Sequence, residues 1–251
     1  MFKLMKYEFR KQAFSKLVIL ALVGLIEVLF LFGVVTSREN LIGTAMGLLF
    51  SFSFGALFFL AFESILTYSN DLKQKCSYML FLTPNTSYSI VGAKVLSAGI
   101  QIVLAGLAFF AVFAIDAGIL IAKYDAIAQV KEAALQLLDQ FFNLRIQFTD
   151  ILAVVIEIIS RWISTITLAF FSITLSTTFL ANNKFKGVVS FIIFIALNVI
   201  FSKIVNLVLG SPDNFLNNVS MYFILDSLII LCFTVVTYIG TAWMLERKVS
   251  V

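Results

Sequence analysis

Six segments of the chain are apolar over the length that a helix needs to cross a lipid bilayer. The hydrocarbon core is about 30 Å thick, which takes about 20 helical residues. The six segments are 17–35, 45–67, 94–122, 162–181, 187–209 and 219–243. A transmembrane barrel would instead show alternating segments of about 10 residues, a pattern that the chain lacks. The sequence therefore predicts an all-α, polytopic membrane protein with six transmembrane helices over residues 17–243.

Composition supports the same fold class. The 251 residues are 61% hydrophobic and 13% charged, whereas soluble domains average about 45–50% apolar and about 25% charged. The chain has no histidine and only two cysteines, Cys76 and Cys232, which lie far apart in the sequence. We therefore expect no metal, no cofactor and no disulfide. The net charge of +4 does not indicate nucleic-acid binding, because the location of the cations matters more in a membrane protein.

The distribution of lysine and arginine predicts the orientation. Four cations, Arg38, Lys123, Lys131 and Arg145, fall on one side of the six spans. Twelve fall on the side of the amino terminus, namely Lys3, Lys6, Arg10, Lys11, Lys16, Lys73, Lys75, Lys94, Lys184, Lys186, Arg247 and Lys248. Cytoplasmic loops carry the excess of positive charge, so both termini are predicted to be cytoplasmic, with residues 244–251 as a tail.

The first residues, 1–16, have the pattern of an amphipathic helix. Phe2, Met5 and Phe9 recur at helical spacing, and a basic stripe lies beside them. Such a helix lies in the membrane interface, with its cations over anionic lipid. The alternative is the charged front of a signal peptide, but the following apolar run is too long and shows no cleavage site.

The insert at 123–161 is expected on the outer side. Its first part, 125–142, has the spacing of an amphipathic surface helix. The apolar stretch 151–159 is too short to span alone and either extends the fourth span or forms a re-entrant piece. Glu157 and Arg161 are four residues apart with the acid first, the favourable order for a helical ion pair.

Residues 70–86 interrupt the apolar chain with charges and turn formers. Ser69 or Asn70 can cap a helix start, and Pro84 disfavours helical geometry at the residue before it. The pattern predicts a short cytoplasmic amphipathic helix at 71–83. Two roles stay open on these grounds: a helix that reconnects two spans, or a surface on which a cytoplasmic partner docks.

The same region resembles a family. A basic amino-terminal helix, six spans, the loop Ser-Asn-Asp-Leu-Lys at 69–73, the motif Tyr-Met-Leu-Phe-Leu-Thr-Pro at 78–84 and Gly-Ala-Lys at 92–94 are similar to permease subunits of type-2 ABC exporters. The resemblance implies a coupling helix that docks on a separate cytoplasmic ABC ATPase, a homo- or heterodimer of permeases, and a bacterial plasma membrane. It assigns ATPase coupling to Asp71, Leu72, Lys73, Lys75, Cys76, Met79, Leu80 and Pro84. The chain contains no G-x-x-x-x-G-K-[ST] phosphate loop of its own.

Charged residues inside spans are functional candidates, because burial in lipid is costly. Lys203 and Asp226 are predicted at similar depth on adjacent spans and are expected to form an ion pair. Glu27 has no evident partner at its depth, so we expect it either to be protonated or to face an aqueous cavity. Lys94 and Asp116 are expected near the ends of the third span, where a lysine can extend toward water.

The second span carries two stripes. Gly43, Gly47, Ser51 and Gly55 recur every four residues and would allow a close helix contact. Beside them runs a ridge of Phe50, Phe54, Phe58 and Phe62. The stripes predict either helix packing within the monomer or a surface outside it, namely a dimer seam or an apolar wall of a substrate cavity or gate.

The function expected from these features is an ATP-driven exporter subunit that moves a hydrophobic or amphipathic substrate, such as a peptide, a lipid-like molecule or a drug. It would not be an enzyme itself. The alternatives are a non-transporting immunity or sensor subunit on the same fold, and a lipid-modifying membrane enzyme. The enzyme is disfavoured because the acids are scattered over different spans rather than gathered at one depth.

Overall fold

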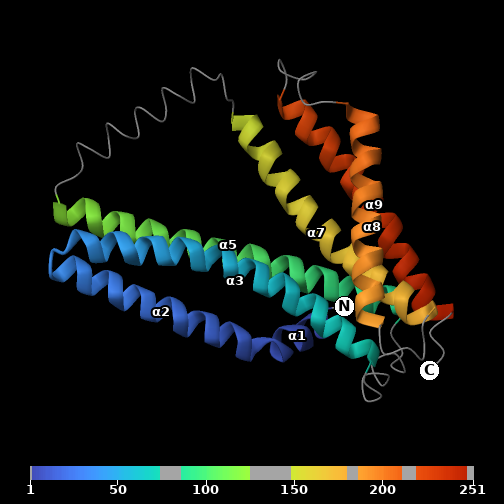
Figure 1. Ribbon diagram of the computed structural model, residues 1–251, viewed down its shortest axis with the longest axis horizontal. Coiled ribbons are helices and arrows are strands. Elements are labelled where there is room, and N and C mark those ends of the chain that lie inside the picture. The colour runs from blue at the N-terminus through green and yellow to red at the C-terminus, as the bar shows by residue number, and fades with distance from the viewer. Residues whose placement is uncertain (1, 74–85, 125–147, 180–185, 211–218, 248–251) are drawn as a thin grey trace. The chain divides into compact units, whose positions relative to one another are not determined.

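The computed structural model describes residues 2–73, 86–124, 148–179, 186–210 and 219–247, and every element in these ranges is an α-helix (Figure 1). The helices are α1 (Phe2–Lys11), α2 (Ala13–Val35), α3 (Glu39–Lys73), α5 (Ser87–Tyr124), α7 (Phe148–Phe179), α8 (Lys186–Leu209) and α9 (Val219–Arg247). The described ranges contain no strand. The all-α fold class is therefore confirmed.

All of these helices except α1 are long and apolar enough to cross a membrane. The most apolar 18-residue stretch of each helix has a mean hydropathy between 1.8 and 2.9. The candidate spans are 23 to 37 residues long. The number of spans agrees with the six apolar segments of the sequence. The chain is a multi-pass membrane protein.

Helix boundaries differ from the prediction at the amino-terminal ends of the chain and of the spans. α1 ends at Lys11 and α2 begins at Ala13, so the first long helix begins before the apolar segment 17–35 that predicted it. The interfacial helix is correspondingly shorter than residues 1–16. The basic side chains of Arg10 and Lys11 lie in the last turn of α1, where cations favour the negative end of the helix dipole.

The predicted helix start at Ser69 or Asn70 is wrong, because α3 continues without a break from Glu39 through Lys73. Tyr68 and Leu72 are buried, with 1% and 6% of their surface exposed. Packing of this turn against the rest of the protein outweighs the local preference of serine and asparagine for a cap. Residues 74–85, which hold the rest of the predicted coupling helix, lie outside the described residues.

α7 settles the alternative left open for residues 151–159. The helix is continuous over Phe148–Phe179, so these residues extend the fourth span and do not form a re-entrant piece. The amphipathic helix predicted at 125–142 lies outside the described residues.

The chain divides into two compact units. The carboxyl-terminal unit contains Met1–Lys6, Glu63–Gly99 and Gln147–Val251, and the amino-terminal unit contains Tyr7–Phe62 and Ile100–Ile146. Because the divisions fall inside α1, α3 and α5, each of these helices belongs to both units.

In the amino-terminal unit, α2 and α3 pack beside the tight turn that joins them. Phe30, Val34, Ile42 and Ala45 form its buried core, against which Met46, Ile119 and Leu120 pack. The turn amides of Thr36, Ser37 and Arg38 donate to carbonyls of the last turn of α2, and Ser37 adopts a φ of 53°. Lys123 at the end of α5 donates to the hydroxyl of Ser37 at 2.9 Å, which ties α5 to the turn.

In the carboxyl-terminal unit, α7 packs along both α8 and α9 (Figure 1). Phe201, Val205 and Leu209 on α8 form a core cluster with Ile230 on α9. The rings of Phe201 and Phe233 stack with centroids 4.2 Å apart. These contacts fix which face of α8 points inward.

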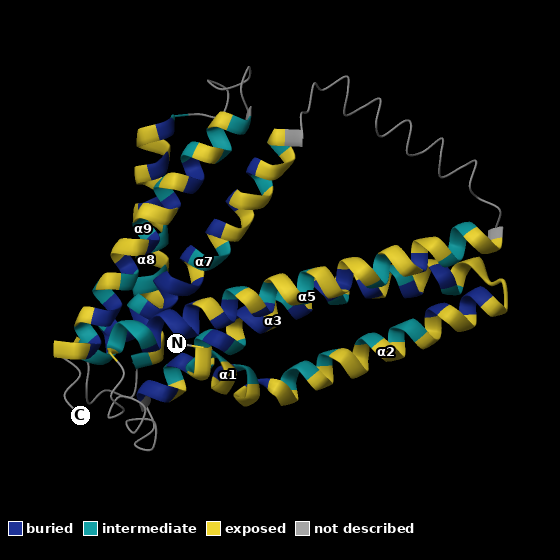
Figure 2. Cartoon of the chain, turned by 180° about the vertical axis from the view of Figure 1, so that it is seen from behind, coloured by how far each residue is buried: buried dark blue, intermediate teal, exposed yellow. Residues whose placement is uncertain are grey.

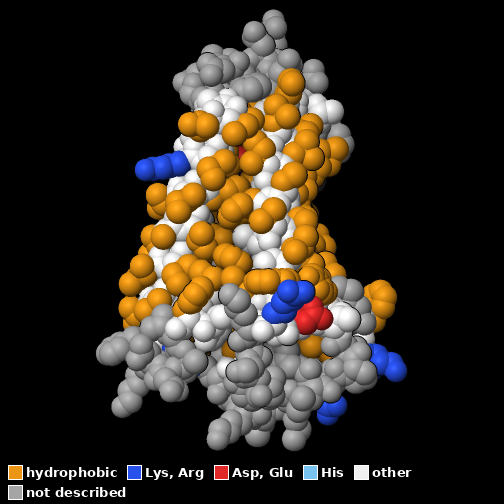
Figure 3. Space-filling model, turned by 90° about the vertical axis from the view of Figure 1, so that its right-hand side faces the viewer, with side chains coloured by type: hydrophobic (Ala, Val, Ile, Leu, Met, Phe, Trp, Pro, Cys, Tyr) orange, Lys and Arg blue, Asp and Glu red, His pale blue; other side chains and the backbone are white. Residues whose placement is uncertain are grey.

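The exterior is apolar where the helices are long. Figure 2 shows exposed positions along every helix, and the exposed side chains include many leucines, isoleucines and phenylalanines. On the face shown in Figure 3, hydrophobic side chains cover the helices in a broad band, and the visible charges gather mainly near one end. This is the surface that a lipid bilayer covers.

Candidate functional site

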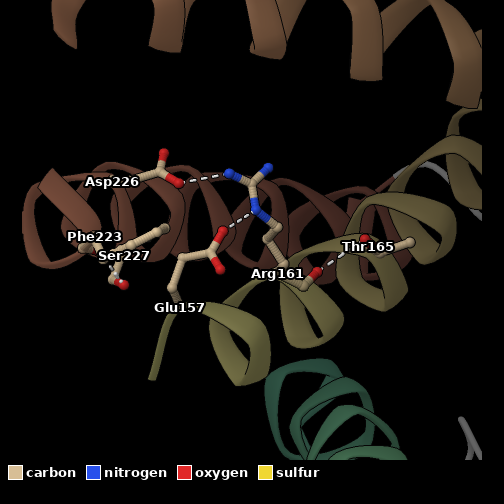
Figure 4. A network of polar contacts seen from close by, with 6 residues as sticks. All are labelled: Glu157, Arg161, Thr165, Phe223, Asp226 and Ser227. Carbon is tan, nitrogen blue, oxygen red and sulfur yellow. Dashed lines mark hydrogen bonds and ion pairs between the residues drawn. The ribbon is translucent and has the colours of Figure 1, made fainter. Parts of the chain in front are cut away.

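Three charged side chains from α7 and α9 form a network inside the carboxyl-terminal unit (Figure 4). Arg161 donates from Nη2 to Oδ2 of Asp226 at 2.5 Å and from Nε to Oε1 of Glu157. The Asp226 side chain is 1% exposed, Glu157 is 11% exposed and Arg161 is 55% exposed. The predicted ion pair between Glu157 and Arg161 is confirmed, and the network extends it to a second helix.

The predicted ion pair between Lys203 and Asp226 is wrong. Asp226 bonds Arg161 instead, and Lys203 is exposed. The reason is rotation rather than depth. Phe201 and Val205 point into the core with Ile230, and a residue two positions from each lies about 200° around the helix. Lys203 therefore faces away from α9, although it lies at a similar depth.

A second polar site lies where α3 ends and α5 begins, in the same unit. Lys94 donates from Nζ to Oδ2 of Asp71 at 2.5 Å, and the two side chains are 4% and 6% exposed. Lys94 therefore does not extend toward water as expected. A buried pair of this kind depends on both partners, because removal of one leaves an unpaired charge in the interior.

Tyr68 continues this site toward α7. Its hydroxyl lies 2.6 Å from Oγ1 of Thr174, and its ring stacks on Phe170 with centroids 4.1 Å apart. On the other flank, the Tyr238 hydroxyl donates to the backbone oxygen of Tyr88 at 2.7 Å. The end of α3 and the start of α5 are thus held to each other and to α7 and α9. We call the residues Tyr68, Asp71, Lys94 and Thr174 the anchor cluster.

The predicted coupling residues divide between two environments. Asp71 and Leu72 are buried, so they hold α3 in place and present little surface to a partner. Lys73 is the last residue of α3. The remaining residues, Lys75, Cys76, Met79, Leu80 and Pro84, lie outside the described residues. Their docking role stays a prediction.

Glu27 has a partner that sequence reasoning missed. Its carboxyl group lies close enough to that of Asp116 on α5 for the two to interact, within the amino-terminal unit. Each acid lies about two turns before the end of its helix, at Val35 and Tyr124. Asp116 is 2% exposed, and it was placed at the membrane boundary on depth alone.

The small-residue stripe of α3 does not pack within the described part of the chain. A Cβ atom added at Gly43, Gly47 or Gly55 would meet nothing within 4 Å, and Ser51 is exposed. Packing within the monomer, one of the two alternatives, is therefore wrong for the described residues. The neighbouring ridge of Phe50, Phe54, Phe58 and Phe62 is also more than half exposed.

A groove of about 420 Å³ lies between α2 and α3 in the amino-terminal unit. Its walls are almost wholly apolar and come from Phe14, Ser15, Val18, Ile19, Leu22, Phe52, Gly55, Ala56 and Phe59. Of the residues predicted to line a cavity or gate, neither Glu27, Phe54 nor Phe58 belongs to it. Gly55 is the one position of the small-residue stripe that does.

Among the described residues, no three cysteine or acidic side chains gather as metal ligands. The network around Arg161 and the anchor cluster are two sites in which polar side chains from different helices form hydrogen bonds. The contacts between helices could not be assembled from sequence spacing, because those partners lie between 23 and 106 residues apart. No known protein family, curated protein or solved structure matches this chain.

Proposed function

We propose that this chain is the membrane-spanning subunit of an ATP-driven exporter of the type-2 ABC class. Its cargo is a hydrophobic or amphipathic molecule that leaves the cell. ATP is hydrolysed by a separate cytoplasmic subunit, and two membrane subunits, identical or related, form the pathway. No residue of this chain performs covalent chemistry.

The observation that carries the proposal is the buried Asp71–Lys94 pair at 2.5 Å. It joins the two helices that flank residues 74–85, the segment whose motif resembles a coupling helix. A segment attached to helices that are themselves joined passes a displacement to both of them. The anchor cluster adds α7 to this connection through Tyr68 and Thr174. Transmission of force from an ATPase requires a docking segment that is rigidly joined to the membrane-spanning helices in this way.

The proposal places the protein in the plasma membrane of a bacterium, with both termini and residues 74–85 in the cytoplasm. The excess of lysine and arginine on that side supports this orientation. It also puts the anchor cluster next to the cytoplasm, within reach of a soluble ATPase.

The test is purification of the tagged chain from its native membrane in mild detergent, followed by identification of its companions and assay of ATP hydrolysis. Wild type should retain an ABC ATPase. Leu80→Glu, in the proposed docking segment, should lose it. Val249→Glu places the same acidic charge in the carboxyl-terminal tail and should leave the complex intact.

Recovery of the chain without any ATPase would contradict the proposal. So would an ATPase that remains bound to Leu80→Glu as firmly as to wild type. The Lys94→Met variant tests the anchor cluster separately. If its complex still hydrolyses ATP but the rate no longer changes when substrate is added, the anchor cluster transmits force between the two subunits.

A further inference from the structure

The network around Arg161 has an odd charge count. Two acids, Glu157 and Asp226, share one cation, so the three side chains carry one net negative charge when all are ionised. α7 and α9 are both membrane-spanning helices, and an uncompensated charge is expensive there. Lys203, which was expected to supply a second cation, faces away.

One oxygen of the network also lacks a partner. Oδ1 of Asp226 is buried and accepts no hydrogen bond from any described residue, and the residue is 1% exposed. An unpaired acceptor in the interior costs the desolvation of that group. A hydrogen atom on the Asp226 carboxyl would remove the net charge, and it would lower the cost of the unpaired oxygen because a neutral carboxyl group is less costly to bury than a carboxylate.

We propose that Glu157, Arg161 and Asp226 form an intramembrane site that binds one exchangeable proton, shared between the two carboxyl groups. The site is defined by the described residues alone. It does not rest on the assignment of this chain to an exporter, and it holds for any function of the protein.

The site selects a proton over larger cations. Asp226 is too deeply buried to meet an ammonium group or a hydrated metal ion. The guanidinium of Arg161 bonds both acids (Figure 4) and fills the space in which a larger cation would have to bind. A metal such as Ca²⁺ takes 6–8 oxygen ligands, whereas this network offers two carboxyl groups.

The charged groups that act on Asp226 are Arg161 and Glu157, both from α7. From α8, the other helix packed on α9, the charged residue at this level is Lys203, and it is exposed. α9 itself carries its further charges, Glu246 and Arg247, near its distant end. Glu157 is more exposed than Asp226.

The net charge of the network predicts how two single substitutions change proton binding. Asp226→Asn leaves Glu157 and Arg161 as a neutral pair, and Glu157→Gln leaves Asp226 and Arg161 as one. Each single variant therefore abolishes proton binding, although each removes a different acid. Glu246→Gln, an exposed acid on the same helix as Asp226, is the matched control.

The measurement is infrared spectroscopy of the full chain in lipid nanodiscs, in which a protonated carboxyl group absorbs apart from a carboxylate. Wild type at neutral pH should show an absorption band of protonated carboxyl groups. In Asp226→Asn and in Glu157→Gln the intensity of this band should fall by the amount that one carboxyl group contributes. Glu246→Gln should retain the band. A band unchanged in both network variants would overturn the proposal.

Thermal unfolding gives a second readout. A folded state that holds one more proton than the unfolded state loses about tenfold in its folding equilibrium per pH unit as the proton dissociates. The unfolding midpoint of wild type should therefore fall as pH rises, and that of Asp226→Asn should stay level. Failure of Asp226→Asn to fold at any pH would overturn the proposal, because asparagine is the neutral isostere of the protonated acid.

Discussion

At the scale of single residues, the interior charges decide what the helices tolerate. Asp71 and Lys94 have almost no exposed surface. Water therefore cannot solvate the charge of one of them when the other is removed. The same reasoning applies to Arg161, because its removal leaves the buried carboxyl group of Asp226 without a cation. Substitutions of Lys94 and Arg161 test this dependence.

Lys94→Met should destabilise the protein by about 3–5 kcal/mol, because it leaves Asp71 as an uncompensated buried charge. The double variant Asp71→Leu/Lys94→Met should recover most of that loss, since no charge remains. Thermal unfolding in detergent measures both, with Lys3→Met on the exposed face of α1 as control. A double variant no more stable than Lys94→Met would contradict the role assigned to the pair.

Arg161→Met should cost about 3–5 kcal/mol, because it leaves Asp226, which is 1% exposed, without its cation. Lys203→Met should be nearly neutral, since Lys203 is exposed and bonds no described acid. Comparing the two unfolding midpoints distinguishes the observed partner of Asp226 from the one that sequence depth suggested. Equal losses from both variants would restore Lys203 as a partner.

Depth along a helix could be predicted from the sequence, and rotation about its axis could not. Counting residues placed Lys203 and Asp226 at one level, and Glu157 and Arg161 on one face of one helix. The second prediction held because it involved a single helix. The first failed because it needed the relative rotation of two helices, which side-chain packing such as that of Phe201 decides. The contact between Glu27 and Asp116 was missed because Asp116 was expected nearer the end of its span than Glu27, so the depth prediction failed at that pair.

At the scale of helices, the turn between α2 and α3 depends on a close approach of backbones. A Cβ atom at Gly33 would lie 3.1 Å from the backbone nitrogen of Ile42 and 3.2 Å from Cβ of Leu41. Backbone cannot move aside as a flexible side chain can. The glycine is therefore required by packing at this point.

Gly33→Ala should cost about 1–3 kcal/mol through this overlap. Gly24→Ala, in the middle of the same helix with nothing within 4 Å, should instead gain up to about 1 kcal/mol of helix propensity. Unfolding midpoints of the two variants give the comparison. A Gly33→Ala protein as stable as Gly24→Ala would show that the turn is looser than described.

Tyr68→Phe should weaken the attachment of α3 to α7 by about 1 kcal/mol, because it deletes the hydrogen bond to Thr174 and keeps the ring on Phe170. Tyr68→Ala should cost about 3–5 kcal/mol, since it also opens a cavity. Tyr7→Phe, more than half exposed, is the control. The order wild type, Phe, Ala in unfolding midpoint is the expected result, and indistinguishable midpoints would argue against the contact.

The buried face of α3 has a less regular sequence pattern than the glycine stripe on the same helix. Its members recur at spacings of three and four, namely Ile42, Ala45, Leu49, Ser53, Ala56, Leu60, Ser64, Tyr68 and Leu72. Small and polar residues are interspersed with apolar ones, as in many helix contacts in membranes. The glycine stripe looked more regular, yet it lies on the outer face. Apolar side chains face lipid as readily as the interior, so hydropathy alone does not identify the packed side.

At the scale of the whole molecule, the fold class and the number of long helices followed from segment length. This inference is robust because the thickness of hydrocarbon and the rise of a helix fix the number of residues per crossing. Helix ends were less predictable. α3, α5 and α7 all continue past the apolar runs that identified them, because packing carries a helix beyond the apolar window.

Orientation is testable with the two native cysteines. A membrane-impermeant maleimide should modify Cys76 in inside-out vesicles and not in intact cells, if residues 74–85 are cytoplasmic. Cys232 is an exposed free thiol in the middle of α9, and in lipid it should react in neither preparation, because the reactive thiolate does not form there. The single variants Cys76→Ser and Cys232→Ser assign the signal. Labelling of Cys76 from outside would invert the orientation.

The position of Asp226 on α9 has a consequence for how the chain is made. Glu157 and Arg161 leave the ribosome on one helix and reach the bilayer already compensating each other. Asp226 is synthesised later and carries no cation on its own helix at that level. An aspartate in an inserting segment opposes translocon insertion, by up to about 2.5–3.5 kcal/mol at the helix centre. Insertion of the hairpin of α8 and α9 therefore depends on the earlier insertion of α7, which supplies the cation for Asp226. This is the order in which the ribosome synthesises these helices.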